Sequence, residues 1–271
     1  MTMLRKVRYT LSRTPVRVPL VWMRHHNFRP GDVFVGSYPR SGSTWLRFML
    51  LEILAGQSSG FANTIEMLPD VGKHEAGAPV LPGSGRLIKT HEAFHAQYKK
   101  AIYLVRDPRD VALSEFAYQK ALGLVHDDFD LYIDRFLQGG VNPFGSWIDH
   151  ATSWVDAADA GRAEILHVNF EELKQKPQEQ LNSIVDFLGM PEVKVRIPTA
   201  IENNSLARMK EKEKANPQRA SAKGRFIRSG SAGGWRSSFT DRQAQLVQQY
   251  AGTLMARLGY SAVESLEGQF A

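Results

Sequence analysis

Glycine, serine and threonine crowd a short turn in the run FVGSYPRSGSTWLRFML at residues 34–50. A Walker-type phosphate-binding loop ends in Gly-Lys-Ser/Thr, because its lysine must reach the outer phosphates of a triphosphate. Here Ser43 follows Gly42 directly, and five residues instead of four separate Gly36 from Gly42. The turn still offers free amides at the start of a helix, which suit phosphate-like groups.

Arg40 favours an anion site over a plain helix cap. Serine and threonine before a helix are common N-caps that need bind nothing, and this interpretation stays open for the polar residues alone. A guanidinium inside the turn adds a fixed positive charge that faces the same way as the amides of Ser43, Thr44 and Trp45. Trp45 also places a flat ring beside the expected anion.

Strands and helices alternate around this turn. Asp32–Ser37 is expected to be a buried strand, and Ser43–Ala55 has apolar residues at helical spacing. Three further apolar strands are expected at Arg86–His91, Ala101–Asp107 and Glu164–Phe170. Helical stretches lie between most of these strands. This order predicts a single α/β domain over residues 31–260, with a parallel sheet flanked by helices and ligands at the carboxyl ends of the strands.

The remaining segments are expected to be arms, loops and a lid. Residues 1–30 form an N-terminal arm and residues 261–271 a C-terminal tail. Residues 56–85 and 139–145 are rich in glycine and proline, which predicts loops. The alternating charges of Lys210–Lys214 and the polar, glycine-rich run after them predict a mobile lid over about residues 205–236.

Composition narrows the function classes. Among 271 residues, 34 Lys and Arg stand against 28 Asp and Glu, and the net charge of +6 favours anionic ligands. The absence of cysteine excludes disulfides, thiolate catalysis and cysteine-ligated metals. The apolar runs are shorter than the roughly 20 residues that a membrane-spanning helix needs, so no membrane insertion is expected. Arg13 and Arg17 interrupt the apolar part of the N-terminal stretch, which favours a cytoplasmic location.

The run YPRSGSTW at residues 38–45 resembles the 5′-phosphosulfate loop of sulfotransferases that use 3′-phosphoadenosine 5′-phosphosulfate (PAPS), in particular a bacterial-type member of the cytosolic family. RLIKTH, YLVRDPRDVALS, NFEELKQKP and FIRSGSAGGWRSSFT resemble later motifs of that family in the same order. Together the matches cover most of residues 34–240. The resemblance implies the P-loop-like sulfotransferase fold, PAPS as donor, adenosine 3′,5′-bisphosphate (PAP) as product, a small-molecule acceptor and no metal.

The resemblance also implies a catalytic set. Arg40 matches the basic residue, usually lysine, that contacts the bridging oxygen between phosphate and sulfate. Arginine stays protonated, so it stabilises charge on the leaving phosphate rather than donating a proton. Lys89 is expected to be a second cation. The backbone amides from Ser41 to Thr44 are expected to stabilise the same charge on the leaving phosphate. His91 matches the general base, since an imidazole with a pKa near 6.5 can accept a proton from the attacking hydroxyl.

Five positions match the family's contacts to the 3′-phosphate, the group that separates this donor from ATP. Arg106 and Ser114 match its arginine and serine. Near the C-terminus, Arg228 and the amide of Gly230 are expected to reach the same phosphate, while Ser229 stands where the family has lysine. Arg109 and Asp110 are expected to form an ion pair of little energetic weight.

The adenine is expected to stack between Trp45 and Phe170, where the family often has tyrosine at the second position. Asn204 and Leu206 are expected nearby. Phe170 could also be a plain core residue, and this alternative stays open.

The acceptor and the partners are less constrained. Residues 60–85 contain Phe61 as their only aromatic residue and carry Glu66, Asp70 and Glu75. We expect one of these carboxylates to line the pocket of a polar acceptor, including a cationic one, sulfated on a hydroxyl or an amine; alternatively they solvate an exposed loop. Residues 236–245 lack the Lys, Val and Glu of the family's dimer motif, which favours a monomer.

Three other functions share some of these sequence features. A kinase-like phosphate-loop enzyme would need the Gly-Lys pair and a magnesium-binding Asp. A nucleic-acid-binding module would show its own motifs and a basic stripe, whereas the basic residues here follow strand ends, so no nucleic acid partner is expected. A carbohydrate or lipid-headgroup sulfotransferase would share the donor site and differ in the acceptor pocket.

Overall fold

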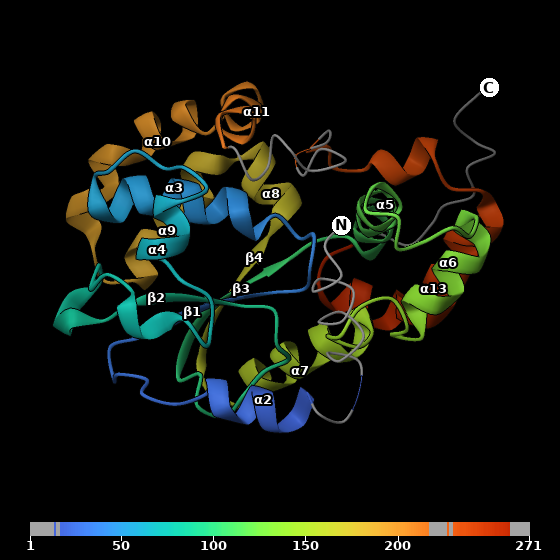
Figure 1. Cartoon of the computed structure of the whole chain (residues 1–271), viewed down its shortest axis with the longest axis horizontal. Helices are drawn as coiled ribbons and strands as arrows, with labels where there is room; N and C mark the ends of the chain where they lie inside the picture. Colours follow the sequence, from blue (N-terminus) through green and yellow to red (C-terminus); the bar gives the residue numbers. More distant parts are fainter. Residues whose placement is uncertain (1–13, 15–16, 217–226, 228–229, 261–271) are drawn as a thin grey trace.

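The expected parallel sheet is confirmed. The computed structural model describes residue 14, residues 17–216, residue 227 and residues 230–260. Within these residues four strands form one sheet in the order β2-β1-β3-β4, and every neighbouring pair is parallel (Figure 1). The strands are β1 (Val33–Ser37), β2 (Leu87–Thr90), β3 (Lys100–Val105) and β4 (Glu164–Asn169).

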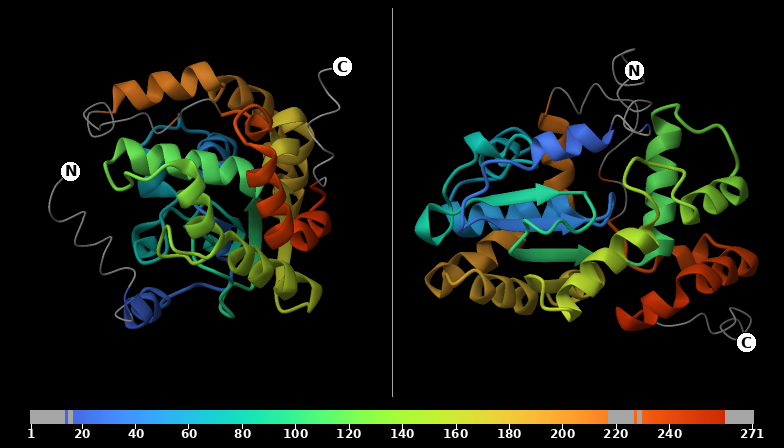
Figure 2. Two further views of the ribbon diagram at one scale, coloured as in Figure 1. Left: turned by 90° about the vertical axis from the view of Figure 1, so that its right-hand side faces the viewer. Right: turned by 90° about the horizontal axis from the view of Figure 1, so that it is seen from below.

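Alternating side chains of the strands bury two apolar layers, one on each face of the sheet. Val33 and Val35 pack into one layer, and Phe34 between them packs into the other. Figures 1 and 2 show helices on both faces. The first layer is covered by α3 (Ser43–Ala55), α8 (Phe170–Gln175), α9 (Pro177–Phe187) and α10 (Ile197–Asn203). The second is covered by α5 (Pro108–Ala121), α6 (Phe129–Leu137), α7 (Trp147–Asp159) and α13 (Asp241–Arg257).

Short elements fill the connections. Residues 56–85, expected to be a loop, contain α4 (Asn63–Met67) and two 3₁₀ turns, η1 (His74–Ala76) and η2 (Pro82–Ser84). The other short elements are α2 (Arg17–Arg24), η3 (Pro191–Arg196), α11 (Leu206–Ala215) and η4 (Gly234–Ser237). The first part of the expected lid is thus the packed helix α11, whose Lys212 donates to Asn204 Oδ1 at 2.8 Å. No described helix is long and apolar enough to cross a membrane.

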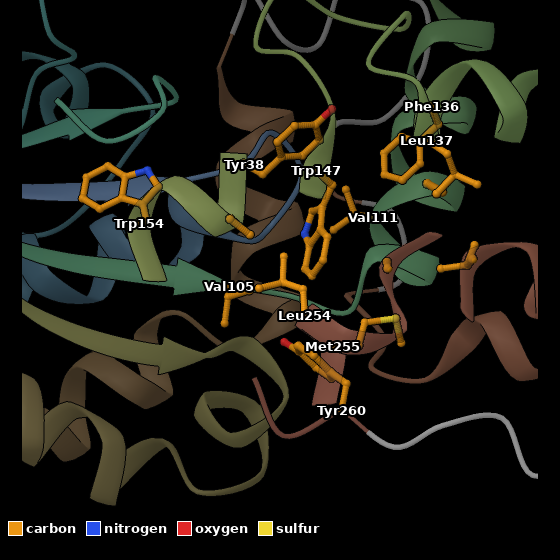
Figure 3. Close-up of a cluster of buried hydrophobic side chains, with 14 of the residues drawn as sticks. Tyr38, Val105, Val111, Phe136, Leu137, Trp147, Trp154, Leu254, Met255 and Tyr260 are labelled. Atoms are coloured by element: carbon orange, nitrogen blue, oxygen red, sulfur yellow. The ribbon is translucent and has the colours of Figure 1, made fainter. Parts of the chain in front are cut away.

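A large aromatic cluster fixes where β1 ends. Trp154 stacks on Tyr103 with ring centroids 5.1 Å apart, and its ring lies against Gly36, where an added Cβ would stand 2.4 Å from it. Figure 3 shows Trp154 together with Tyr38 and Trp147 of this cluster. Tyr38, fully buried in the same cluster, donates its hydroxyl to the Gly145 carbonyl at 2.9 Å and accepts from Asn142 Nδ2 at 2.8 Å. The phosphate-binding turn is therefore tied directly to the 139–145 loop.

Candidate active site

The carboxyl ends of the four strands carry the expected site residues. Arg40 follows β1, His91 follows β2 and Arg106 follows β3. Phe170, expected at the end of the fourth strand, is instead the first residue of α8, because the Asn169 side chain accepts from the Glu171 amide at 2.9 Å and begins the helix. All four positions thus meet at one edge of the sheet, as a parallel topology requires.

The turn after β1 has the backbone of an anion-binding nest. Arg40 and Gly42 have φ angles of 70° and 96°, both in the left-handed region that non-glycine residues rarely adopt. Gly42 caps α3 with no side-chain hydrogen bond; the Trp45 amide donates to the Gly42 carbonyl at 3.0 Å, and the amides of Ser43 and Thr44 before it point out of the helix start. The hydroxyl Oγ of Ser41 is buried and has no hydrogen-bond partner within the described part of the chain. A polar ligand at this turn would satisfy these groups.

Gly42 lies against the ring of Phe170. A Cβ added to Gly42 would stand 2.6 Å from ring carbons of Phe170, closer than real Cβ atoms come. The position therefore needs glycine for its φ angle and for this contact.

Arg106 ties the turn to the segment before η4. Its Nη1 donates to the carbonyl of Arg40 at 2.9 Å and its Nη2 to the carbonyl of Ser231 at 2.8 Å, while the guanidinium lies 4.5 Å from the centroid of the Phe170 ring. Its Nε is buried without a hydrogen-bond partner among the described residues. An anion between the turn and α5 would therefore find a fixed cation.

The Arg40 side chain reaches across to α5. Its Nε donates to Ser114 Oγ at 3.1 Å, and its guanidinium lies 4.7 Å from the centroid of the Tyr118 ring. Arg40 and Ser114, expected at the two phosphates of the donor, are thus in direct contact. Tyr118 follows Ser114 by four residues and so lies on the same helix face.

Trp45 and Phe170, expected on either side of the adenine, both line the cavity. Their rings lie edge to face, with centroids 6.0 Å apart and an interplanar angle of 72°. Trp45 is held in place because its Nε1 donates to the carbonyl of Asn204 at 2.8 Å. Phe170 is buried, and Leu206 is 42% exposed. Asn204 therefore supports the nucleotide side of the site by positioning Trp45.

The hydrogen bond of His91 fixes its tautomer. Its Nδ1 lies 2.6 Å from the backbone oxygen of Ser37, which can only accept, so Nδ1 carries the proton and Nε2 carries the lone pair. Burial, followed by the charge of Lys89, holds the pKa of His91 well below its usual value of 6.5. A neutral imidazole with a free Nε2 is the state that a general base needs.

Lys89 does not line the cavity beside His91. Its ammonium lies 3.5 Å from Asp70 Oδ1, and Arg47 Nη1 donates to the same oxygen at 3.2 Å. The backbone of residues 69–71 pairs with Lys89, which places Asp70 next to it. Burial lowers the pKa of Lys89 to about 8, and the Asp70 carboxylate opposes this shift.

One cavity of about 450 Å³ joins the phosphate-binding turn to His91. Most of the expected residues line it: Arg40, Gly42, Ser43, Thr44, Trp45, His91, Arg106, Ser114, Phe170, Asn204, Leu206 and Gly230. Ser41 lies buried behind the wall, and Arg228 and Ser229 lie outside the described residues. Lining residues that the sequence did not reveal are Pro39, Glu115, Tyr118, Asn142, Pro143, Phe144, Lys174, Met209 and Ile227. Signals existed for some of them: Lys174 and Ile227 lie within quoted motifs, Asn142, Pro143 and Phe144 within the expected 139–145 loop, and Tyr118 four residues after Ser114.

The expectation that Glu66, Asp70 or Glu75 lines the cavity was wrong. All three residues lie outside its lining. Asp70 faces Arg47 and Lys89, and Glu75 accepts from Asn27 Nδ2 at 2.6 Å. Pairing of the Asp70 backbone with Lys89 on β2 holds the Asp70 carboxylate against Lys89 and Arg47.

The Arg109–Asp110 ion pair is not formed either. Arg109 pairs with Asp107 at 2.7 Å and lies 3.7 Å from the centroid of the Trp235 ring. Asp110 is buried and accepts from the amides of Gly233 and Trp235 at 2.7 and 2.9 Å. Asp110 therefore anchors the backbone of residues 233–235 rather than a surface pair. Within the described part of the chain, no group of three His, Cys, Asp or Glu residues is arranged to hold a metal ion.

Comparison with known proteins places this site in a family. Residues 30–259 match the sulfotransferase domain family, and the chain belongs to it. The chain is therefore a sulfotransferase of the PAPS-dependent class, with PAPS as donor and PAP as product.

The similar proteins come from several branches of the family. Human sulfotransferase 2B1 is 31% identical over 236 residues, which make up 80% of this chain and 64% of that protein. Mouse sulfotransferase 1B1 is 28% identical over 253 residues, or 83% of this chain and 84% of the relative.

Solved structures share the fold. Mouse sulfotransferase SULT7A1 complexed with PAP superposes with a TM-score of 0.65 at 24% identity, covering 86% of this chain and 87% of that one. Retinol dehydratase in a complex with retinol and PAP gives 0.66 at 22% identity, covering 84% and 82%. At these identities the superpositions support the fold of the chain.

Proposed function

We propose that this chain transfers the sulfuryl group of PAPS to a hydroxyl or an amine of a small polar acceptor. The observation that carries the proposal is that the phosphate-binding turn and the free Nε2 of His91 share one cavity. A donor held by the turn and an acceptor beside His91 would therefore meet inside the protein.

The residues present fit a doubly phosphorylated donor. The first-turn amides of α3 and the Arg40 guanidinium would hold the 5′-phosphosulfate. Arg106 and Ser114 would hold the 3′-phosphate, together with Arg228, Ser229 and the amide of Gly230, whose roles rest on the family resemblance. The buried Arg106 Nε supports this fit, because Arg106 lines the cavity and this atom lacks a hydrogen-bond partner among the described residues.

Bound PAPS supplies a sulfuryl group on a phosphate leaving group. In the proposed reaction His91 Nε2 takes the proton of the acceptor as the new oxygen–sulfur or nitrogen–sulfur bond forms. Arg40 stabilises the negative charge that remains on the phosphate when the old oxygen–sulfur bond breaks. Lys89 contributes a positive charge from behind the wall, where Asp70 holds it.

A polar acceptor is supported by the wall around His91. Phe144 packs against His91, and Asn142, Glu115 and Tyr118 line the same cavity. Solved relatives are described in complex with retinol and with androsterone. The wall of this chain adds a carboxylate and an amide to its aromatic rings, which favours an acceptor with further polar groups.

An acceptor screen tests this function. The protein is incubated with sulfur-labelled PAPS and phenols, aminoalcohols, glycosides or lipid headgroups, and mass spectrometry identifies the product. We expect a product heavier than the acceptor by one SO3 unit, and only from small polar acceptors. Sulfation of glycosides or headgroups alone would favour the alternative classes, and no product from any acceptor would contradict the proposal. Three expectations stay predictions: the monomeric state, the cytoplasmic location and the bacterial type. Light scattering tests the first, and cell fractionation of the source organism tests the second.

A further inference from the structure

A buried carboxylate lies in the wall of the cavity, and the proposed reaction does not use it. Glu115 on α5 is 5% exposed and lines the cavity together with His91 and Phe144. Among the described residues, its carboxylate accepts one side-chain hydrogen bond, from Gln119 Nε2 at 2.7 Å. A carboxylate can accept about four hydrogen bonds, so Glu115 retains capacity for a ligand.

Glu115 belongs to the acceptor side of the cavity. Gln119 Nε2 also donates to the carbonyl of Val141 at 2.9 Å, which ties Glu115 to the 139–145 loop. Phe144 of that loop packs against His91 with ring centroids 5.5 Å apart. The carboxylate and the expected base therefore face the same space.

The surroundings of Glu115 favour a cation. Burial raises the pKa of Glu115, and the nearby Arg40 opposes the shift, so the ionised form gains from every positive charge that enters the cavity. The two neighbouring rings already hold cations: Arg40 lies 4.7 Å from the centroid of Tyr118 and Arg17 lies 4.9 Å from that of Phe144. Aromatic faces of this kind attract ammonium groups as well.

We propose that Glu115 determines acceptor specificity by binding a positively charged ammonium group of the acceptor. The proposal rests on the proposed sulfotransferase function and names its substrate class: a hydroxyl-bearing molecule with an ammonium group a few atoms from the hydroxyl. Glu115 binds the ammonium, and His91 faces the hydroxyl that is sulfated. A neutral acceptor of the same shape gains no charge-assisted contact with the carboxylate, whose side-chain hydrogen bond among the described residues stays the one from Gln119.

Two phenols that differ only in charge test this assignment. Tyramine carries an ammonium group where 4-propylphenol carries a methyl group. Their dissociation constants for the PAP-saturated protein are measured by calorimetry, and their kcat/KM values are measured with PAPS. We expect the wild type to prefer tyramine by roughly tenfold or more, since a buried charge-assisted hydrogen bond contributes on the order of one such factor.

Matched variants locate the preference. Glu115→Gln keeps the shape of the side chain and is expected to remove the preference for tyramine while binding of 4-propylphenol and PAP stays unchanged. Glu66→Gln changes an exposed glutamate outside the cavity and is expected to keep the preference.

The contrary results are distinct from one another. Equal binding of the two phenols by the wild type, or binding of neither to the PAP complex, overturns the proposal without need of a variant. Loss of PAP binding in Glu115→Gln would also overturn it, because the carboxylate would then serve Arg40 and the donor. Failure of the wild type to bind PAP would instead contradict the proposed function.

Discussion

His91 Nδ1 lies 2.6 Å from the backbone oxygen of Ser37, the last residue of β1. The end of β1 thus orients His91, which follows the neighbouring strand β2. The contact occupies Nδ1 and leaves the lone pair on Nε2. The turn that carries Arg40 and Gly42 begins directly after Ser37, so this turn and His91 share one support.

Replacing His91 is expected to separate binding from chemistry. We expect His91→Ala to lower turnover of a hydroxyl acceptor by roughly 10²- to 10⁴-fold, because the attacking hydroxyl loses its base. The PAP dissociation constant should change little, since the turn and Arg106 remain in place. Single-turnover kinetics and calorimetry measure the two quantities, and unchanged turnover would remove His91 from the mechanism.

The dependence of kcat/KM on pH is expected to show two limbs of different origin. On the acid side, activity should persist below pH 6.5, because burial and Lys89 keep the pKa of His91 well below that value. On the alkaline side, activity should fall around pH 8, where the buried Lys89 loses its charge.

Variants at two positions assign the alkaline limb. Asp70 raises the pKa of Lys89, so Asp70→Asn should move this limb to lower pH. Lys89→Arg should abolish the limb, because a guanidinium stays protonated. An alkaline limb that neither variant moves would show that Lys89 does not assist the reaction.

Gly42→Ala is expected to disrupt the phosphate-binding turn. The new Cβ would stand 2.6 Å from the Phe170 ring at a φ angle of 96°, so the turn must shift. Gly161→Ala is a matched control, because Gly161 also has a positive φ angle of 61° but has open space around it.

The control isolates the contact with Phe170. Both variants should lose about 1–2 kcal/mol of unfolding free energy from the backbone alone. Only Gly42→Ala should lose more than this and weaken PAP binding by roughly tenfold or more. Thermal unfolding and calorimetry check both quantities; equal losses in the two variants, with PAP binding intact, would contradict the assigned role of Gly42.

Local sequence patterns predicted the elements that carry the donor site. The apolar run before Ser37 and the glycine-containing turn gave the strand and the helix start, because these depend on neighbours in the chain. Glu115 and Phe144 were missed because they line one cavity only through the packing of α5 against the 139–145 loop. Asp70 was misplaced for a similar reason: pairing of residues 69–71 with Lys89 on β2 sets its direction.

The discrimination between PAP and ATP tests the central claim most directly. Arg106 and Ser114 line the cavity with the phosphate-binding turn and are assigned to the 3′-phosphate, which ATP lacks. Thermal unfolding of the full chain is followed in increasing concentrations of either nucleotide without metal. We expect PAP to raise the melting temperature in a saturable manner and ATP to raise it only weakly, because stabilisation grows with the ratio of ligand concentration to its dissociation constant. Equal shifts with the two nucleotides, or no shift with PAP, would contradict the assignment of this cavity to a PAPS donor.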